Sequence, residues 1–222
     1  MFKWYEEAKS IVERDPAARN VWQVIFQYPG YKAVRAYRKA HWFHKRGFYF
    51  IARAISQLAR HRYGIEIHPG AKIGKGLFID HGMGIVIGET TEIGDNVTIY
   101  KGATLGGTGK ETGKRHPTIG NNVVISSGAK VLGPFKVGDN SKIGAGAVVL
   151  REVPPNCTVV GVPGRIVKRD NIPVGKSSGE AIDLDQVKLP DPVADALKRL
   201  TVRILELEEK IERLEAEEAK EQ

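Results

Sequence analysis

The sequence predicts a parallel β-solenoid, preceded by a helical segment and followed by one further helix. The first observation is a six-residue spacing of aliphatic residues in three stretches, Ile67 to Ile79, Ile87 to Leu105 and Ile119 to Val149. A period of six does not fit a helix, whereas three short strands of about six residues make one coil of a solenoid. The second is the glycine that often follows these residues, because tight corners need backbone freedom. The third is the helical pattern of both flanking segments.

Residues 1–64 are predicted to form an N-terminal helical domain. Asp15 followed by Pro16 is typical of a helix N-terminus. Two further helices are expected on either side of Gly47. The aromatic residues of this segment are most simply explained as core: Trp22, Phe26, Tyr31, Tyr37, Trp42 and Phe43.

Residues 65–168 are predicted to form the solenoid, a prism with a sheet on each of its three faces. β-Branched residues at this spacing favour short parallel strands. The aliphatic residue of each unit is expected to point inward and to stack on the one a coil, about 18 residues, further on. The periodicity does not give the handedness of the coil.

Residues 169–222 are predicted to be a linker and a C-terminal amphipathic helix. Two arrangements are open for this helix: three copies meet on a symmetry axis, or each helix packs on its own subunit. Its apolar residues are spaced alternately four and three residues apart: Val193, Leu197, Leu200, Ile204, Leu207, Ile211 and Leu214.

The composition favours a cytoplasmic protein. The single cysteine, Cys157, excludes an internal disulfide framework, suits a reducing compartment and is most simply a buried apolar residue. The first ten residues carry charges and no apolar run, so no signal peptide is expected. No apolar stretch reaches the roughly 18 residues of a membrane span.

The formal charge of +8 is unevenly distributed, with a basic first segment and an acidic end. A basic balance is compatible with nucleic acid, a membrane surface or an anionic small molecule. No nucleic-acid-binding motif is visible, so no nucleic acid partner is expected. A phosphorylated cofactor is the more economical partner.

The six-residue spacing is first interrupted after Ile79, where it slips by two residues. The slip holds Asp80 and His81, followed by glycines that allow close approach of a ligand. A neutral imidazole is a suitable general base for a hydroxyl, and a carboxylate improves it by fixing its tautomer. Glu66 lies about one coil before His81 and is the candidate for that carboxylate.

The second interruption lies between Leu105 and Ile119, where the chain uses 14 residues instead of 12. It predicts a loop that leaves the prism and returns, carrying Arg115 and His116. A metal site built from His68, His81 and His116 is an alternative. No two of these three histidines lie a few residues apart in the sequence, so no metal is predicted.

Several segments together resemble serine O-acetyltransferase, a hexapeptide-repeat acyltransferase family, over about residues 13–168. The specific matches are the DHGMG segment and the GGTGK…RHP loop, since the repeat alone is shared by many acyltransferases. The segments are RDPA from Arg14, IHPGAKIGKGLFIDHGMGIVIGET, TLGGTGKETGKRHPTIG, GAKVLG, KIGAGAVVL and VVGVPGRIV.

The resemblance implies a left-handed parallel β-helix in a homotrimer, with active sites between neighbouring subunits. It implies transfer of acetyl from acetyl-CoA to the hydroxyl of L-serine, giving O-acetylserine for cysteine biosynthesis. His81 would be the general base that promotes direct attack on the thioester. Glu66 stands where the family has the aspartate that accompanies this histidine.

The resemblance also assigns substrate groups. Asp15 and Asp80 would take the substrate ammonium, and Arg115 and His116 its carboxylate, and these charges suit those tasks. CoA would lie along the groove between solenoids. The corresponding residues are Ser127, Lys142 and Ala145 for the pantetheine arm and adenine side, and Arg165 and Lys168 for the phosphates.

Two departures from the family pattern bear on partners. The helical segment is shorter than in members that form hexamers, which favours a trimer. The chain ends in Lys220, Glu221 and Gln222 instead of the isoleucine that docks into O-acetylserine sulfhydrylase, which argues against that complex. The family also implies L-cysteine as a feedback inhibitor, because cysteine fits the serine site.

Three other functions remain open from the residues. The first is an acetyltransferase for another hydroxyl, that of homoserine or a sugar, although the ammonium and carboxylate groups favour an amino acid. The second is a zinc carbonic anhydrase of the same solenoid type. The third is a non-catalytic scaffold that uses the acidic helix for assembly.

Overall fold

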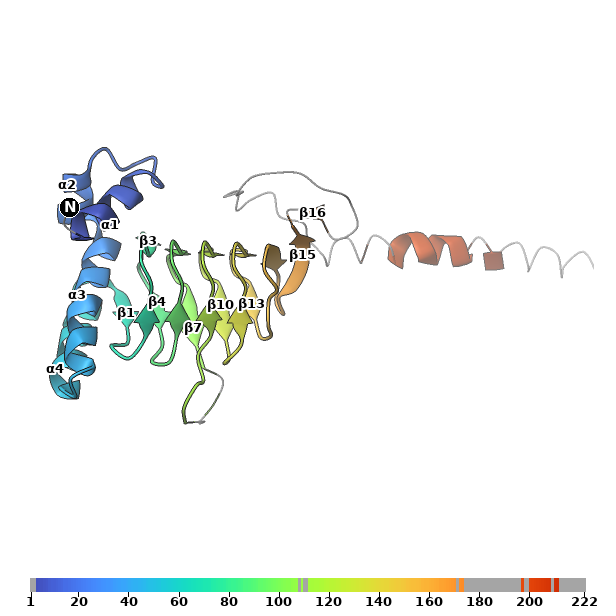
Figure 1. The fold of residues 1–222 in the computed structure, drawn as a ribbon. Coiled ribbons are helices and arrows are strands. Elements are labelled where there is room, and N and C mark those ends of the chain that lie inside the picture. Colours follow the sequence, from blue (N-terminus) through green and yellow to red (C-terminus); the bar gives the residue numbers. More distant parts are fainter. Residues whose placement is uncertain are drawn as a thin grey trace, which may run out of the picture. The chain divides into compact units, whose positions relative to one another are not determined.

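The computed structural model describes residues 3–107, 109, 112–170, 172–173, 197, 200–208 and 210–211. The chain divides into two units, Met1–Leu189 and Pro190–Gln222. The first unit contains the helical segment and the solenoid (Figure 1). The parallel β-helix predicted from the sequence is confirmed.

Four helices precede the solenoid. The first turn of α2 is capped by Asn20, whose side chain accepts a hydrogen bond from the Gln23 amide at 2.9 Å. The predicted helix start at Asp15 is therefore wrong: Asp15 lies in a turn, and the next helix begins six residues later. The helices are α1 (Lys3–Val12), α2 (Val21–Gln27), α3 (Pro29–His44) and α4 (Tyr49–Tyr63).

Sixteen short strands follow in the described part of the chain. They are β1 (Ile65–Ile67), β2 (Lys72–Ile73), β3 (Phe78–Asp80), β4 (Ile85–Ile87), β5 (Glu92–Ile93), β6 (Thr98–Tyr100), β7 (Thr104–Gly106), β8 (Thr118–Ile119), β9 (Val124–Ile125), β10 (Lys130–Leu132), β11 (Lys136–Val137), β12 (Lys142–Ile143), β13 (Val148–Val149), β14 (Cys157–Val160), β15 (Arg165–Arg169) and β16 (Ile172–Pro173).

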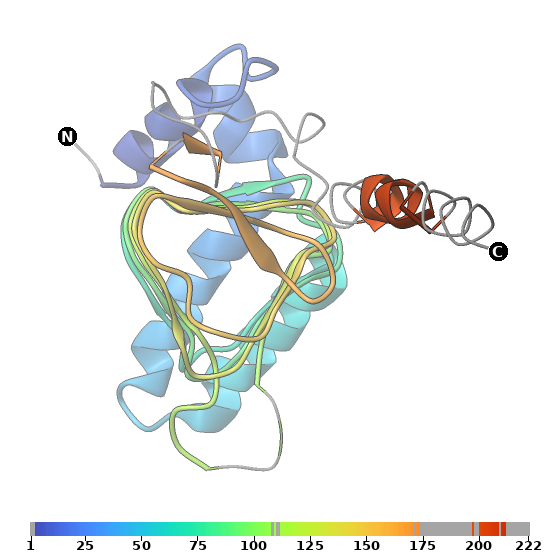
Figure 2. The ribbon, with the colours of Figure 1, turned by 90° about the vertical axis from the view of Figure 1, so that its right-hand side faces the viewer.

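Every third strand joins the same sheet, so the coils form a triangle when viewed along the axis (Figure 2). The first sheet has the order β1-β4-β7-β10-β13 and the second β2-β5-β8-β11. The third runs β3-β6-β9-β12-β14-β15-β16. All pairs are parallel except β14–β15 and β15–β16, where the chain turns back across the last coil.

The interior of the prism is filled by the aliphatic residues of the repeat. Equivalent residues stack directly, as shown by the pairing of Ile125 with Ile143, 18 residues apart. Ile79 pairs instead with Ile99, 20 residues away, so the two-residue slip predicted from the sequence is confirmed. Side chains that are less than 2% exposed include Ile65, Ile85, Ile87, Ile99, Leu105, Ile119, Ile125 and Ile143.

Helices α3 and α4 are fastened to the first coil of the solenoid. The Tyr37 hydroxyl donates to the Ala71 carbonyl at 2.6 Å, and the Ser56 hydroxyl donates to the Ile67 carbonyl at 2.7 Å. A Cβ on Gly30 would lie 2.2 Å from the Ile79 carbonyl oxygen, so only glycine permits this approach of α3. These contacts position the helical segment beside the slip that carries His81.

The aromatic residues of the helical segment divide between core and surface. Tyr31 and Tyr37 are buried, as predicted. Trp22, Phe26 and Trp42 are at least half exposed, so their assignment to the core is wrong for this chain. A helix can carry aromatic residues outside its buried stripe, and the sequence does not say which side of the stripe each one takes.

In the second unit, the described residues 197, 200–208 and 210–211 are helical. The linker residues 174–196 and the predicted seam residues Val193 and Leu214 lie outside the described residues. Over the part of the chain that is described, no helix is both long and apolar enough to span a membrane.

Candidate active site

His81 lies in the turn between β3 and β4, where the two extra residues of the slip are accommodated. Its backbone is left-handed, with φ of 57°, and its side chain is 75% exposed. The imidazole Nε2 lies 3.8 Å from the Asp80 carboxylate. The turn thus places an accessible imidazole at an edge of the prism, beside the Asp80 carboxylate.

Asp15 and Tyr28 of the helical segment join this edge. The Asp15 carboxylate accepts hydrogen bonds from the Ala17 amide at 2.8 Å and from the Tyr28 hydroxyl at 2.7 Å. Arg14 ties this turn to the solenoid by donating to the Gly76 carbonyl at 2.7 Å. The Asp15 carboxylate is therefore held by one hydrogen bond from its own turn and one from Tyr28.

The electrostatics of this edge favour a cationic ligand. Burial raises the pKa of Asp80 above its usual value, and nearby Asp15 raises it further, while His81 acts in the opposite direction. The pKa of Tyr28 rises to about 12, through burial first and then its hydrogen bond to Asp15. Tyr28 is thus a permanent donor, and a cation between the two carboxylates would relieve their repulsion.

Glu66, predicted to orient His81, lies in β1 and contacts α4. Its carboxylate pairs with Arg53 at 3.1 Å and with Arg60 at 3.3 Å, and on the next rung it faces Val86. Between the described residues Glu66 and His81 there is no ion pair or hydrogen bond. The structure therefore does not join Glu66 to His81 within one chain.

Arg115 and His116 come back to the prism at a different edge, the turn between β4 and β5. The Arg115 guanidinium pairs with Glu89, which holds the pKa of that carboxyl below its usual value. The Thr90 hydroxyl accepts from the backbone amides of Arg115 at 3.0 Å and His116 at 3.1 Å. Glu89 and Thr90 thus anchor the end of the loop.

The His116 ring is buried and is held in one tautomer. Its Nδ1 accepts from the Thr90 amide at 3.2 Å, so the neutral ring carries its proton on Nε2. Burial, and then the charge of Arg115, lower the pKa of His116. A Cβ at Gly88 would lie 2.0 Å from the ring, so this packing requires glycine.

The two groups do not meet within one chain. His81 lies where the chain passes from the third sheet to the first, and Arg115 contacts the turn where it passes from the first sheet to the second. The whole width of the first sheet separates the two edges, and Figure 2 shows the loop before β8 leaving one corner of the triangle.

The predicted CoA residues Ser127 and Ala145 lie along the same edge as His81. Strand register places Lys101, Ser127 and Ala145 on successive rungs above it. Backbone bonds repeat along this edge, from Gly128 to Lys101 and from Gly146 to Ser127, each at 2.9 Å. The edge is therefore a regular track that leads away from the imidazole.

Of the three predicted basic CoA residues, Lys142 lies on the same rung as Ala145, and Arg165 and Lys168 lie further along the third sheet. Lys142 is buried in β12 and pairs through its backbone with Thr158, which in turn pairs with Lys168 in β15. Arg165 begins β15, is exposed and lines a cavity of about 460 Å³ at the last coil. Since β15 lies beyond β12 in this sheet, Arg165 and Lys168 lie toward the end of the prism that is far from His81.

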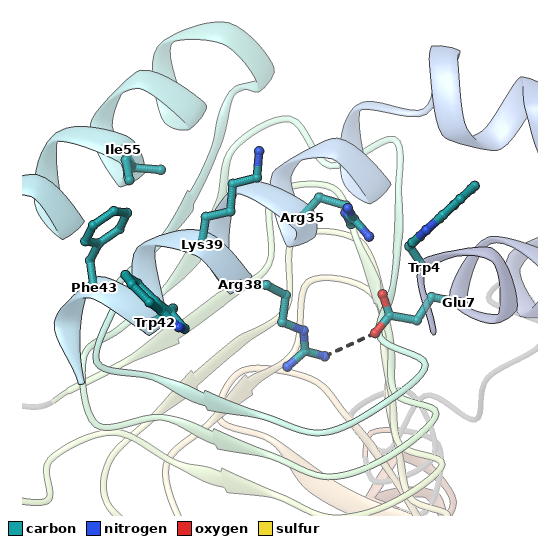
Figure 3. Close-up of a pocket in the computed structure, with 8 residues that line it drawn as sticks. All are labelled: Trp4, Glu7, Arg35, Arg38, Lys39, Trp42, Phe43 and Ile55. Atoms are coloured by element: carbon teal, nitrogen blue, oxygen red, sulfur yellow. Dashed lines mark ion pairs between the residues drawn. The ribbon is translucent and has the colours of Figure 1, made fainter. Parts of the chain in front are cut away.

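The other candidate chemistry does not gather into a site. The described residues contain no group of three or more His, Cys, Asp or Glu side chains that could hold a metal ion. Cys157 is buried, as predicted. A cavity of about 460 Å³ lies among the helices (Figure 3) but includes none of the predicted site residues. Its lining is Trp4, Glu7, Arg35, Arg38, Lys39, Trp42, Phe43 and Ile55, with Arg38 and Glu7 paired at 3.7 Å.

Sequence reasoning missed Tyr28, Glu89 and Thr90. Tyr28 stands beside the Pro29-Gly30 pair and was not distinguished from the other aromatic residues of the segment. Glu89 and Thr90 occupy a corner after a repeat unit, where polar residues are common. Only the contacts across 13 to 26 residues that the fold creates reveal their roles.

Known proteins give a consistent picture. The family model described as bacterial transferase hexapeptide (six repeats) matches residues 116–151. The serine acetyltransferase of Bacillus subtilis is 56% identical over 207 residues, covering 93% of this chain and 93% of that protein.

Solved structures agree with the sequence relatives. The serine acetyltransferase of Neisseria gonorrhoeae in complex with serine matches with a TM-score of 0.72 and 42% identity, covering 75% of this chain and 68% of that one. A serine acetyltransferase in complex with cysteine matches with a TM-score of 0.72 and 41% identity, covering 73% and 67%. The chain belongs to the serine acetyltransferase family.

Proposed function

We propose that this protein transfers the acetyl group of acetyl-CoA to the hydroxyl of L-serine, with His81 as the general base. The observation that carries the proposal is the juxtaposition of an exposed imidazole with Asp80 and with Asp15, which is close enough to raise the pKa of Asp80. A base beside paired carboxylates suits a substrate that carries both a hydroxyl and an ammonium group.

The reaction is a direct transfer. His81 accepts the hydroxyl proton as the serine oxygen attacks the thioester carbonyl carbon, which gives a tetrahedral oxyanion. Collapse of this intermediate breaks the carbon–sulfur bond, and the proton on His81 passes to the departing thiolate of CoA. No acyl-enzyme is needed, and Cys157 is buried and cannot serve as a nucleophile.

The substrate carboxylate is bound by Arg115 and His116 of a neighbouring copy. One chain keeps these residues at a different edge from His81, so two copies must contribute to each site. Glu89 holds the Arg115 guanidinium in place. A ring of three copies would repeat this pairing three times, and we propose such a homotrimer.

The co-substrate lies along the track that starts at His81. Ser127 and Ala145 line the pantetheine arm, Lys142 lies beside it, and Arg165 and Lys168 receive the phosphates. The strand register that aligns Ser127 and Ala145 with His81 supports this direction. The thioester would then arrive at the imidazole from the solenoid side.

We further propose that Glu66 orients His81 in the assembled site. Gly84 donates to the Gly64 carbonyl at 2.8 Å, so the chain after His81 runs beside the start of β1. The exposed imidazole is free to turn toward β1, where Glu66 stands next to Ile65. Asp80 is the competing partner, since it lies nearest to the ring in the single chain.

Two further expectations concern ligands and location. L-Cysteine has the same ammonium and carboxylate groups as serine, so it would occupy the same site and inhibit. A cytoplasmic location, favoured by the single cysteine, stays a prediction.

Tyr28→Phe is expected to raise the KM for serine several-fold and to leave kcat nearly unchanged. Such a change corresponds to about 1 kcal/mol, the contribution of one hydrogen bond. The phenol holds Asp15 for the ammonium but does not touch the reacting atoms. Steady-state kinetics with varied serine measure the effect. Tyr31→Phe, which removes a hydroxyl bound to the Trp4 carbonyl, is the matched control. An unchanged KM for Tyr28→Phe would show that Asp15 needs no such support.

Release of free CoA from acetyl-CoA in the presence of L-serine, L-homoserine, a sugar or no acceptor tests the function itself. Serine should support turnover at least about tenfold faster than the others. Homoserine has the same charged groups but places its hydroxyl one methylene further from them, and a sugar lacks both groups. Equal rates with all acceptors would overturn the substrate assignment. No release with any acceptor would favour the scaffold hypothesis.

A further inference from the structure

The described part of the C-terminal helix carries an exposed apolar seam. The seam residues Leu197, Leu200, Ile204, Leu207 and Ile211 are 45–60% exposed. They alternate at three and four residues, which is the spacing of positions a and d in a coiled coil. An isolated helix is not stabilised by apolar residues that stay in water, so this seam indicates a surface that binds another apolar seam.

The charges beside the seam identify that partner. With Leu197, Ile204 and Ile211 at position a, Arg203 and Lys210 fall at position g. Position e is taken by Glu208, and in the sequence also by Glu215, which lies outside the described residues. The two flanks of the seam therefore carry opposite charges.

This arrangement separates parallel from antiparallel pairing. In a parallel coiled coil, position g faces position e of the next heptad on the other helix, so Arg203 meets Glu208 and Lys210 meets Glu215. In an antiparallel pair, g faces g and e faces e, which would place cations against cations and carboxylates against carboxylates. Like charges at these positions disfavour that orientation.

We propose that this helix binds the same helix of another copy of the chain, parallel and in register. The sequence complements itself in that orientation, so no other protein is required. Copies related by a rotation axis also send their helices in the same direction along that axis. The orientation is independent of the proposed acetyl transfer. Only the number of helices, three, rests on the proposed homotrimer.

Contacts within the helix do not replace this partner. Arg203 pairs with Glu206 of the same helix at 2.8 Å, and both side chains are more than half exposed. Exposed pairs of this kind contribute little to stability. Val202 and Leu205 are also exposed but lie off the a and d positions, so they offer a control surface on the same helix.

Disulfide cross-linking of the full-length protein tests the proposal. Cys157 is the only cysteine and is buried, so a cysteine introduced at position 207 would be the accessible thiol. A disulfide needs Cα atoms within about 7 Å, which position d provides only in a parallel, in-register pair. Leu207→Cys should form covalent dimers under mild oxidation at a yield at least about fivefold above that of Leu205→Cys.

Charge reversal in the Leu207→Cys background tests the register. Arg203→Glu or Glu208→Arg alone puts like charges opposite each other and should lower the cross-linking yield. The double variant restores the pairing between helices but not the Arg203–Glu206 pair, so its recovery isolates the contact between copies.

Two results would overturn the proposal. Equal cross-linking at positions 207 and 205 would mean that the seam does not bring two copies together. A yield that falls with each reversal and falls further in the double variant would exclude parallel pairing. Acetyl transfer to serine, measured on the same variants, should stay at the wild-type rate. Loss of that activity with intact cross-linking would count against the proposed function and not against the coiled coil.

Discussion

Replacing His81 with asparagine is expected to lower kcat by about a hundredfold or more and to leave the affinity for CoA largely unchanged. The variant removes the base that accepts the serine proton. It keeps the turn intact, because His81 has a left-handed backbone that asparagine tolerates well. This chain already uses asparagine in that conformation at Asn96, Asn122 and Asn140, with φ of 55° to 58°. Steady-state kinetics and a CoA binding titration measure the two effects.

The matched control is His61→Asn, since His61 is an exposed histidine of α4 that lies outside the proposed site. It should retain wild-type kcat. Near-full turnover of His81→Asn would place the base elsewhere. Glu66→Gln completes the set and should lower kcat roughly tenfold or more if its carboxylate fixes the tautomer of His81. If kcat holds while the protein melts at a lower temperature, Glu66 serves only its pairs with Arg53 and Arg60.

The solenoid could be predicted because its packing rule is local and repeats. Each coil uses the same inward positions, so the spacing alone predicts that residues such as Ile125 and Ile143 stack on each other. The slip before His81 was visible for the same reason, since a regular pattern makes its own interruption conspicuous. The helix start at Asp15 failed because several polar residues compete for the role, and Asn20 occupies it.

The candidate site was predictable only in its parts. Residue type and position singled out Asp80 and His81, the resemblance to serine acetyltransferases added Asp15, and the fold brings the three together at one edge. It brings Arg115 and His116 to another edge, where Glu89 and Thr90 hold them. Spacing along a chain does not say which corner of a prism a loop returns to, so this separation could not be read from the sequence.

That separation has a chemical consequence. If the residues that bind the serine ammonium lie on one copy and those that bind its carboxylate lie on the next, then neither edge alone distinguishes an amino acid from a simple alcohol. The isolated chain would hold a base but only half of the specificity. Assembly would complete the site, and substrate selection would become a property of the oligomer.

Mixed oligomers should reveal this sharing directly. His81→Asn and Arg115→Ala are each expected to be nearly inactive at low serine, the second because it loses a charge-assisted contact to the substrate carboxylate. The two variants, co-expressed with different tags and purified through both, give only oligomers that contain both chains. Any such trimer has one junction at which an intact His81 meets an intact Arg115, whether its composition is two to one or one to two. It should therefore recover about one third of wild-type activity.

The competing arrangements give different values. About one half would indicate a dimer with a shared site, by the same counting. A site built within one copy gives no recovery, because every chain then carries one damaged residue. Each variant mixed with itself through two tags is the control and should remain inactive. Since the recovered fraction depends on which copies supply the two edges and not on the rate constant itself, this single number tests both the shared site and the ring of three.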